Sequence, residues 1–292
     1  MSPTGNPGAL LTEVDDRLTT ALPEPSCELD HDDAWQLLIV TILSAQAKDS
    51  VINEIRPELF ARWPTPFALA QAPQDEVEVV VKRSGYFRNK AKAIRECAQA
   101  IAERHNGEVP RTHEQLVALP GASHKTANLV LGIAFGLASG IVVDTHVARV
   151  CERLGLVKPN ASPEAIEKQL CDALPQERWI GISHRLILHG RHVCQASEPD
   201  CGRCAINELC GSRRVPPTDD WRTRAETEGR LFAVRGDRDR AGWGPKPGRS
   251  SSAADSGVAF ERSLELEPEP EPTVNSSPSP SRAAPVEDEE DF

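Results

Sequence analysis

Apolar residues recur along most of the chain at the spacing of one face of a helix. Positions three, four, seven and eight residues apart are filled by Trp35, Leu38, Ile39, Ile42 and Leu43. Residues 90 to 105 repeat the pattern with Ala91, Ile94, Cys97, Ala98 and Ile101. This period is typical of amphipathic helices that bury one side. We predict a further short amphipathic helix over residues 9 to 21.

Capping residues stand where the predicted helices begin. Asp32 or Asp33 precedes one apolar face, and Ser162 followed by Pro163 precedes another. Such residues accept hydrogen bonds from the free amides of a first helical turn, and proline suits its first position. The β-branched run IVVDT at residues 141 to 145 is too short to make a sheet by itself. The sequence therefore predicts an all-α fold.

The two ends of the chain depart from this helical pattern. Hydrophobic residues make up 39% of the 292 residues, but residues 251–292 are rich in Ser, Pro and Glu. Such a segment cannot bury enough apolar surface to offset the entropy of ordering, so we expect a disordered acidic tail. Residues 213–250 form a net-basic extension before this tail, and we expect residues 1–8 to be a flexible N-terminus.

Charge and cysteine usage restrict the class of protein. The net charge of −11 argues against a nucleic-acid partner, but the acidic tail carries −9 and residues 1–210 only −6. The chain begins without the basic and apolar stretches of a signal peptide, and it contains no membrane-spanning run. The eight cysteines suggest no disulfide framework. We expect a reducing, cytoplasmic compartment, with nucleoid association if the source is bacterial.

Four of the cysteines are crowded together near the end of the helical region. They are separated by six, two and five residues, and they are Cys194, Cys201, Cys204 and Cys210. Four thiolates at this spacing can close around one metal centre. A structural zinc site and free thiols are the alternatives, but zinc sites usually pair two short C-x2-C turns. The spacing therefore favours an iron–sulfur cluster over zinc.

A second motif is LPGASHKTANLVLGIAF at residues 119–135. Thr112 and Gln115 form a capping box for a helix before it, and Leu-Pro-Gly makes a tight turn into the next helix. Exposed amides in such a helical hairpin can hold a phosphate, although a plain helical corner is also common. Lys125 lies in the first turn of the second helix, where a cation is disfavoured. A solvated surface charge is the ordinary interpretation of a lysine, and an amine nucleophile is the sharper one.

Asp144 precedes a further apolar face and suits the N-cap position of that helix. This role alone would explain it, but a carboxylate can cap a helix and take part in catalysis at once. For the neighbouring His146 we expect a packed or hydrogen-bonded side chain.

Together these segments resemble the endonuclease III family, in the family's order, over roughly residues 9 to 212. The hairpin LPGASHKTAN resembles its LPGxGxKTAN, and VDTHVARVCERLGL resembles its VDTHxxRVxxRxGL. LSAQAKD and GYFRNKA resemble its LSAQxTD and GLYxxKA, and HRLILHGRHVC leads into the same cysteine spacing. The combination is far more specific than any one motif.

The resemblance implies a two-lobed helix-hairpin-helix glycosylase fold. Residues 31–142 would form a six-helix barrel lobe with the hairpin at 112–135, and residues 9–30 and 143–212 a cluster lobe. It also implies a [4Fe–4S] cluster on the four cysteines, Lys125 as nucleophile and Asp144 as the assisting carboxylate. The implied DNA-binding residues are Gln46, Tyr86, Gly121 and Ser123. Gln46 would fill the gap left by a flipped base, and Tyr86 takes the place of a usually aliphatic wedge.

The function implied is base-excision repair. The protein would be a DNA N-glycosylase with AP-lyase activity that acts through a Lys125 Schiff base. It would act as a monomer on double-stranded DNA that contains abasic sites or damaged bases, such as oxidised pyrimidines. A glycosylase for thymine or uracil opposite guanine is an alternative on the same scaffold. A non-catalytic iron–sulfur module that binds DNA is the alternative from another class.

The sequence departs from the family pattern in three places. Ser123 replaces the second hairpin glycine, which would strain the backbone if a positive φ were needed there. Lys48 replaces a usual threonine. Glu198 and Asp200 stand in the cluster loop where basic residues are common, so we expect little DNA affinity from that loop.

Overall fold

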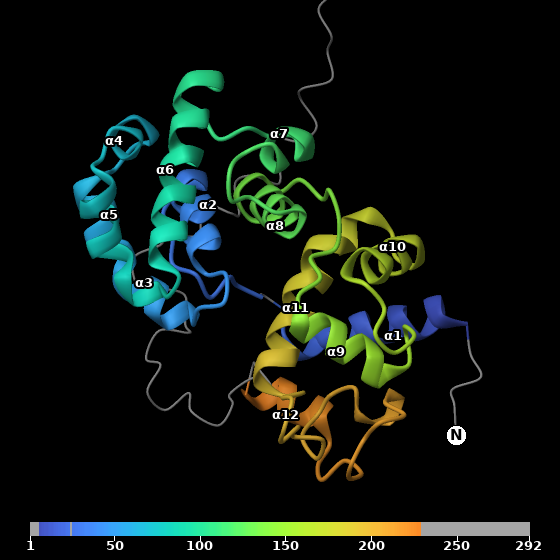
Figure 1. The fold of residues 1–292 in the computed structure, drawn as a ribbon. Coiled ribbons are helices and arrows are strands. Elements are labelled where there is room, and N and C mark those ends of the chain that lie inside the picture. The colour runs from blue at the N-terminus through green and yellow to red at the C-terminus, as the bar shows by residue number, and fades with distance from the viewer. Residues whose placement is uncertain (1–5, 24, 229–292) are drawn as a thin grey trace, which may run out of the picture. The chain divides into compact units, whose positions relative to one another are not determined.

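The computed structural model describes residues 6–23 and 25–228. Within these residues every regular element is a helix, which confirms the all-α prediction (Figure 1). The α-helices are α1 (Pro7–Ala21), α2 (Ala34–Leu43), α3 (Asp49–Arg62), α4 (Pro66–Ala70), α5 (Gln74–Val81), α6 (Phe87–Arg104), α7 (His113–Val117), α8 (His124–Phe135), α9 (Thr145–Leu154), α10 (Pro163–Ala173), α11 (Trp179–His192) and α12 (Trp221–Glu228). Short 3-10 helices are η1 (Lys82–Ser84), η2 (Gln176–Arg178) and η3 (Asn207–Leu209). The predicted acidic tail at 251–292 lies outside the described residues.

The helices pack in two groups. Helices α2 to α8 contact one another and enclose a core whose fully buried members include Leu37, Leu38, Ile39, Leu59 and Ile94. Helix α1 from the start of the chain packs with α9 to α12 from its end, on α10, α11 and α12. Figure 1 shows the chain passing from the first group to the second between α8 and α9. In the described part of the chain, no helix has the length and apolar character needed to cross a bilayer.

Local capping explains where several of these helices begin. The Asp33 carboxylate accepts from the Gln36 amide at 2.8 Å, and the Ser162 hydroxyl from the Ala165 amide at 3.2 Å. Helix α1 begins at Pro7, two residues before the predicted start, because Asn6 caps it. These side chains satisfy amides that have no partner inside the helix.

Helix α12 is not predicted by the apolar pattern. Its Trp221 and Ala225 are buried against Ala21 of α1 and Ala205 of the cysteine-rich segment. Two apolar residues in one short helix give too weak a period to be recognised in a sequence. The helix is stabilised by tertiary packing, as most helices of this length are.

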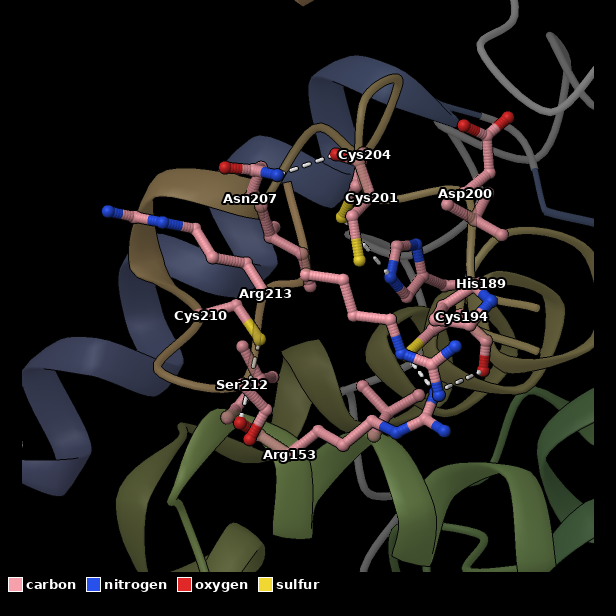
Figure 2. A pocket seen from close by; sticks show the side chains of 16 residues that line it. Arg153, His189, Cys194, Asp200, Cys201, Cys204, Asn207, Cys210, Ser212 and Arg213 are labelled. Carbon is pink, nitrogen blue, oxygen red and sulfur yellow. Dashed lines mark hydrogen bonds between the residues drawn. The ribbon is translucent and has the colours of Figure 1, made fainter. Parts of the chain in front are cut away.

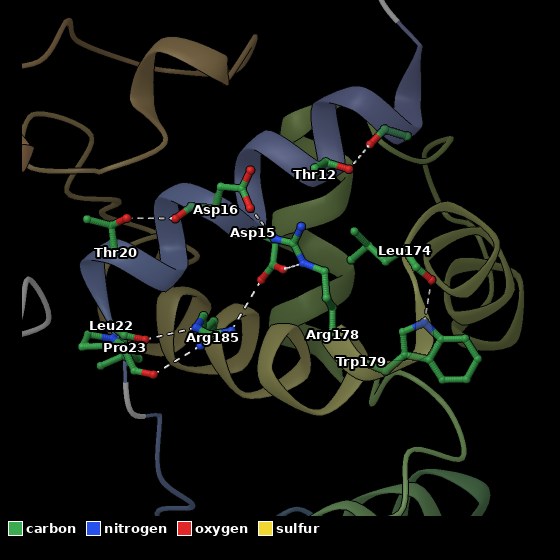
Figure 3. A network of polar contacts seen from close by, with 11 residues as sticks. Thr12, Asp15, Asp16, Thr20, Leu22, Pro23, Leu174, Arg178, Trp179 and Arg185 are labelled. Atoms are coloured by element: carbon green, nitrogen blue, oxygen red, sulfur yellow. Dashed lines mark hydrogen bonds and ion pairs between the residues drawn. The ribbon is translucent and has the colours of Figure 1, made fainter.

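A buried carboxylate joins α1 to the last part of the helical region. Asp15 is 1% exposed, and Figure 3 shows it between the guanidinium groups of Arg178 and Arg185. Burial raises the pKa of Asp15, and the two arginines oppose that shift. Arg185 also donates to the Leu22 carbonyl at 3.1 Å, where the chain leaves α1. The terminal segments of the second helix group are thereby held to one another.

Candidate active site and metal centre

Helices α7 and α8 form the predicted hairpin. The Thr112 hydroxyl caps α7 by accepting from the Gln115 amide at 3.3 Å. In the turn that follows, Gly121 has a φ of +78°, and a Cβ there would lie 3.1 Å from both Ala93 and Ile42. The backbone conformation favours glycine at this position, and a Cβ would crowd side chains of α2 and α6.

Ser123 begins α8 without backbone strain. Its φ is −88°, and its hydroxyl accepts from the Thr126 amide at 3.1 Å. The strain considered for a serine in place of the second hairpin glycine is therefore absent. Ser123 is an N-cap, and serine is among the favoured residues for that role.

Lys125 follows in the first turn of α8, and its side chain is exposed. It forms no ion pair or hydrogen bond with any residue that the structure describes. The N-terminus of a helix carries partial positive charge and disfavours a cation, so helix stability does not explain a lysine at this position. Here the amine is next to a turn whose amides can hold a phosphate, so it can reach an anionic ligand bound at that turn.

Asp144 caps α9, as its position in the sequence predicts. One oxygen, Oδ1, accepts from the amides of His146 at 2.8 Å and Val147 at 2.9 Å. Oδ2 takes neither bond and remains available to another group. The buried residues before it are tied to α11, where the Ser183 hydroxyl accepts from the Val142 amide at 2.9 Å. The carboxylate is therefore held on a fixed section of backbone.

His146 beside it is packed, as expected. Its Nδ1 is 3.2 Å from the Arg149 guanidinium, and burial lowers its pKa.

Gln46 and Tyr86 share an unusual backbone conformation. Gln46 has a φ of 54° in the turn after α2, and Tyr86 has a φ of 47° at the start of α6. Residues with a side chain rarely adopt this left-handed conformation. Both side chains are exposed, and Tyr86 is 68% exposed, so it is not a core residue. Both are available to a ligand that approaches these two turns.

The four crowded cysteines line one cavity. Cys194 follows α11, Cys201 and Cys204 form a short turn, and Cys210 follows η3. Figure 2 shows their thiols around a shared cavity of about 40 Å³, which is partly open to solvent. The cavity also touches α9 through Val150 and Leu154. The structure therefore brings together the four cysteines that the sequence spacing predicts to share one site.

Two arginines on α9 hold the first cysteine segment. Arg153 donates to Cys194 Sγ at 3.2 Å and to the carbonyls of Gln195 and Ala196 at 2.7 and 2.8 Å. Arg149 donates to the Cys194 carbonyl at 3.1 Å. Neither arginine is among the site residues predicted from the sequence. Their spacing of four on one helix, inside VDTHVARVCERLGL, is the signal that could have identified them.

The chemistry of the four thiols suits a metal centre. No three His, Cys, Asp or Glu side chains within residues 6–23 and 25–228 gather closely enough to hold one ion. The four thiols line one shared cavity, so together they could hold a metal centre. Burial raises the pKa of Cys204 to about 12, so an uncompensated thiolate is unfavourable there. Iron bound by these thiols would supply the missing positive charge.

The all-helical fold and the hairpin define a class of DNA repair protein. Residues 39–176 match the family described as HhH-GPD superfamily base excision DNA repair protein. A solved structure of a trapped endonuclease III–DNA covalent intermediate is 37% identical, with a TM-score of 0.68. The match covers 71% of this chain and 97% of that chain.

Two bacterial relatives narrow the assignment. Endonuclease III of Synechocystis sp. is 45% identical over 70% of this chain and 93% of its own length. Endonuclease III of Bacillus subtilis is 40% identical over 67% of this chain and 89% of its own length. The chain belongs to the endonuclease III family, and it is a DNA glycosylase/AP lyase of base-excision repair.

Proposed function

We propose that this protein excises oxidised pyrimidines from duplex DNA and then cuts the strand through a Schiff base on Lys125. The observation that carries this proposal is the exposed Lys125 amine beside the hairpin turn, without an ion-pair partner among the described residues. An amine in that position can attack a sugar whose phosphate is held by the turn.

The proposed reaction begins when the damaged nucleotide is extruded from the duplex. The neutral Lys125 amine attacks C1′, the bond from C1′ to the base breaks, and the base leaves with a proton. The proton that the base takes comes from the amine. As the C1′–O4′ bond then breaks, O4′ takes a proton from solvent, and the nitrogen keeps its remaining hydrogen in a protonated Schiff base. Loss of a proton from C2′ pushes electrons toward C3′, and the 3′ C–O bond breaks with the phosphate as leaving group. Oδ2 of Asp144 stabilises the developing positive charge and assists the proton transfers.

Four further residues would hold the DNA. Gly121 and Ser123 present the hairpin turn to a phosphate, because the backbone there approaches a ligand without a bulky side chain. Gln46 and Tyr86 would occupy the duplex beside the extruded nucleotide, with Tyr86 stacking on a base. Their exposed side chains and left-handed backbone support this role.

We assign a [4Fe–4S] cluster to four cysteines, which would hold it through their thiolates: Cys194, Cys201, Cys204 and Cys210. The cluster would cross-link the segment from 194 to 210. The shared cavity supports this assignment. Purified protein should contain about four irons per chain. Cys201→Ser should lose the iron, while Cys27→Ser, which removes a partly buried thiol outside the cavity, should keep it. Stoichiometric zinc in anaerobically prepared protein would contradict the assignment.

The two helix groups support a division into a barrel lobe at 31–142 and a cluster lobe at 9–30 and 143–212. We place the protein in the cytoplasm as a monomer, with one copy of each candidate residue serving one lesion. Equilibrium sedimentation with and without duplex DNA tests the monomer assignment.

A panel of duplexes with one defined lesion each tests the substrate. Single-turnover reactions should release an oxidised pyrimidine and cleave the strand faster than they act on thymine or uracil opposite guanine. Faster release of thymine or uracil opposite guanine would instead show a mismatch-specific glycosylase on the same scaffold. Tight binding without base release or strand cleavage on any substrate would favour the non-catalytic alternative.

A further inference from the structure

A partly buried carboxylate on α10 contacts the helix that carries Lys125. The Glu167 side chain is 14% exposed, and α10 packs with the second helix group. Its carboxylate nevertheless reaches α8 in the first group, where it lies 2.7 Å from His124 Nε2 and accepts from Asn128 Nδ2 at 2.8 Å. His124 is the residue before Lys125. Glu167 is therefore linked directly to the first turn of α8.

The same carboxylate contacts the segment that leads to Asp144. Gly140 in this segment is buried, and a Cβ there would collide with Glu167 Oε1 and Asn128 Nδ2. Ser139, the residue before Gly140, donates to Asn128 Oδ1 at 2.7 Å, so Asn128 binds both Glu167 and this segment. The segment is thus packed against Glu167 four residues before Asp144.

We propose that Glu167 is a positioning residue that sets Lys125 and Asp144 relative to each other. This inference rests on the proposed roles of those two residues. Both must approach one sugar, and they are carried by segments that Glu167 joins. A misplacement of about 1 Å in such an arrangement can cost about a hundredfold in rate. Apolar side chains would join two helices at a lower desolvation cost than a carboxylate does. A carboxylate that accepts hydrogen bonds also fixes the orientation of its donors, which apolar packing does not.

Three variants test the inference. Glu167→Ala removes both contacts, and Glu167→Gln keeps an oxygen for Asn128 but loses the charge. Asp172→Asn is the matched control, since it removes the same charge from the same helix at an exposed pair with Lys168. The measurements are the single-turnover cleavage rate on saturating abasic duplex, the Kd for a duplex with an uncleavable abasic analogue, and the midpoint of thermal unfolding.

We expect Glu167→Ala to cleave at least about tenfold more slowly, with a Kd within about threefold of wild type. Glu167→Gln should recover part of the rate, and Asp172→Asn should match wild type. Should the alanine variant fail to fold, the glutamine variant decides alone.

A wild-type rate in a folded Glu167 variant overturns this inference, and so does a loss of rate matched by an equal loss of affinity. Failure of the wild-type protein itself to cleave abasic duplex overturns the proposed function instead.

Discussion

Tyr86 and Gln46 have a left-handed backbone conformation that glycine would adopt with less strain. Left-handed φ values at residues with a Cβ cost of order 1 kcal/mol each, and such residues concentrate at functional sites. Neither side chain is buried, so core packing does not account for the choice of residue. The exposed aromatic ring at the start of α6 is consistent with the proposed contact with DNA.

Replacing Tyr86 with glycine should separate these two effects. The unfolding free energy should rise by up to about 1 kcal/mol because the strain is released. Affinity for lesion-containing duplex should fall more than affinity for undamaged duplex, since a stacking contact worth roughly 1–3 kcal/mol is lost. Equal weakening on both duplexes, or a loss of stability, would show that Tyr86 serves the fold.

A conservative change can distinguish the observed capping role of Asp144 from its proposed role in catalysis. Asn also accepts amide hydrogen bonds at an N-cap, so Asp144→Asn should change the unfolding free energy by well under 1 kcal/mol. The single-turnover rate should nevertheless fall at least about a hundredfold, because the charge that assists the reaction is gone. Chemical denaturation and cleavage assays on the same preparation give both numbers. A normal rate would mean that Asp144 only caps α9.

At the scale of helices, sequence predicts what depends on local contacts. The caps at Asp33, Ser162 and Asp144 and the hairpin between α7 and α8 follow from residues within one turn. Helix α12 does not, because its stability comes from Ala21 and Ala205, far away in the chain. Long-range polar contacts leave no local period, and a sequence therefore does not reveal them.

The link between Glu28 and α11 is one of these long-range contacts. Glu28 accepts from Arg191 and His192, and Arg191 also pairs with Asp49 at the start of α3. Burial opposes the charged form of Glu28, but the hydrogen bonds and charges of His192 and Arg191 lower its pKa from 4.5 to about 2. This carboxylate ties the segment after α1 to α11, and the pair between Arg191 and Asp49 extends the link to α3.

The pKa of Glu28 predicts an acid-dependent loss of stability. Its folded pKa lies below the unfolded one, so its contribution is present above pH 4.5 and is lost as the pH falls toward 2. In Glu28→Gln the unfolding free energy should decline less steeply over that interval, by about 1–3 kcal/mol in total. Denaturant titrations at a series of pH values measure this slope. Parallel curves for the two proteins would contradict the assignment.

For the whole molecule, the family and its motifs were predictable from sequence, whereas the connections between the helix groups were not. Cys194 to Cys210 and the hairpin are short motifs, so their geometry follows from their spacing. The contacts of Glu167 with His124 and Asn128 span 43 and 39 residues, and no local sequence pattern predicts them. Distribution of charge over the chain is the global property that sequence still supplies.

That distribution makes a prediction about salt. Residues 251–292 carry eleven acidic and two basic side chains, whereas 213–250 are net basic. A polyanion that competes with DNA for a basic surface should weaken binding most at low ionic strength. Truncation after residue 250 should therefore raise DNA affinity at low salt, with the gain shrinking as salt rises. Identical salt titrations for the two forms would leave the acidic segment without a role in binding.

The central claim is that Lys125 forms a Schiff base with the DNA sugar. The most direct measurement is borohydride reduction of the protein on duplex DNA containing an abasic site, followed by mass spectrometry of the cross-linked peptide. The account predicts a covalent adduct on Lys125 in the wild-type protein. In Lys125→Gln the adduct should be absent, although the variant still binds the duplex. Full trapping by Lys125→Gln, or an adduct mapped to another residue, would contradict the account.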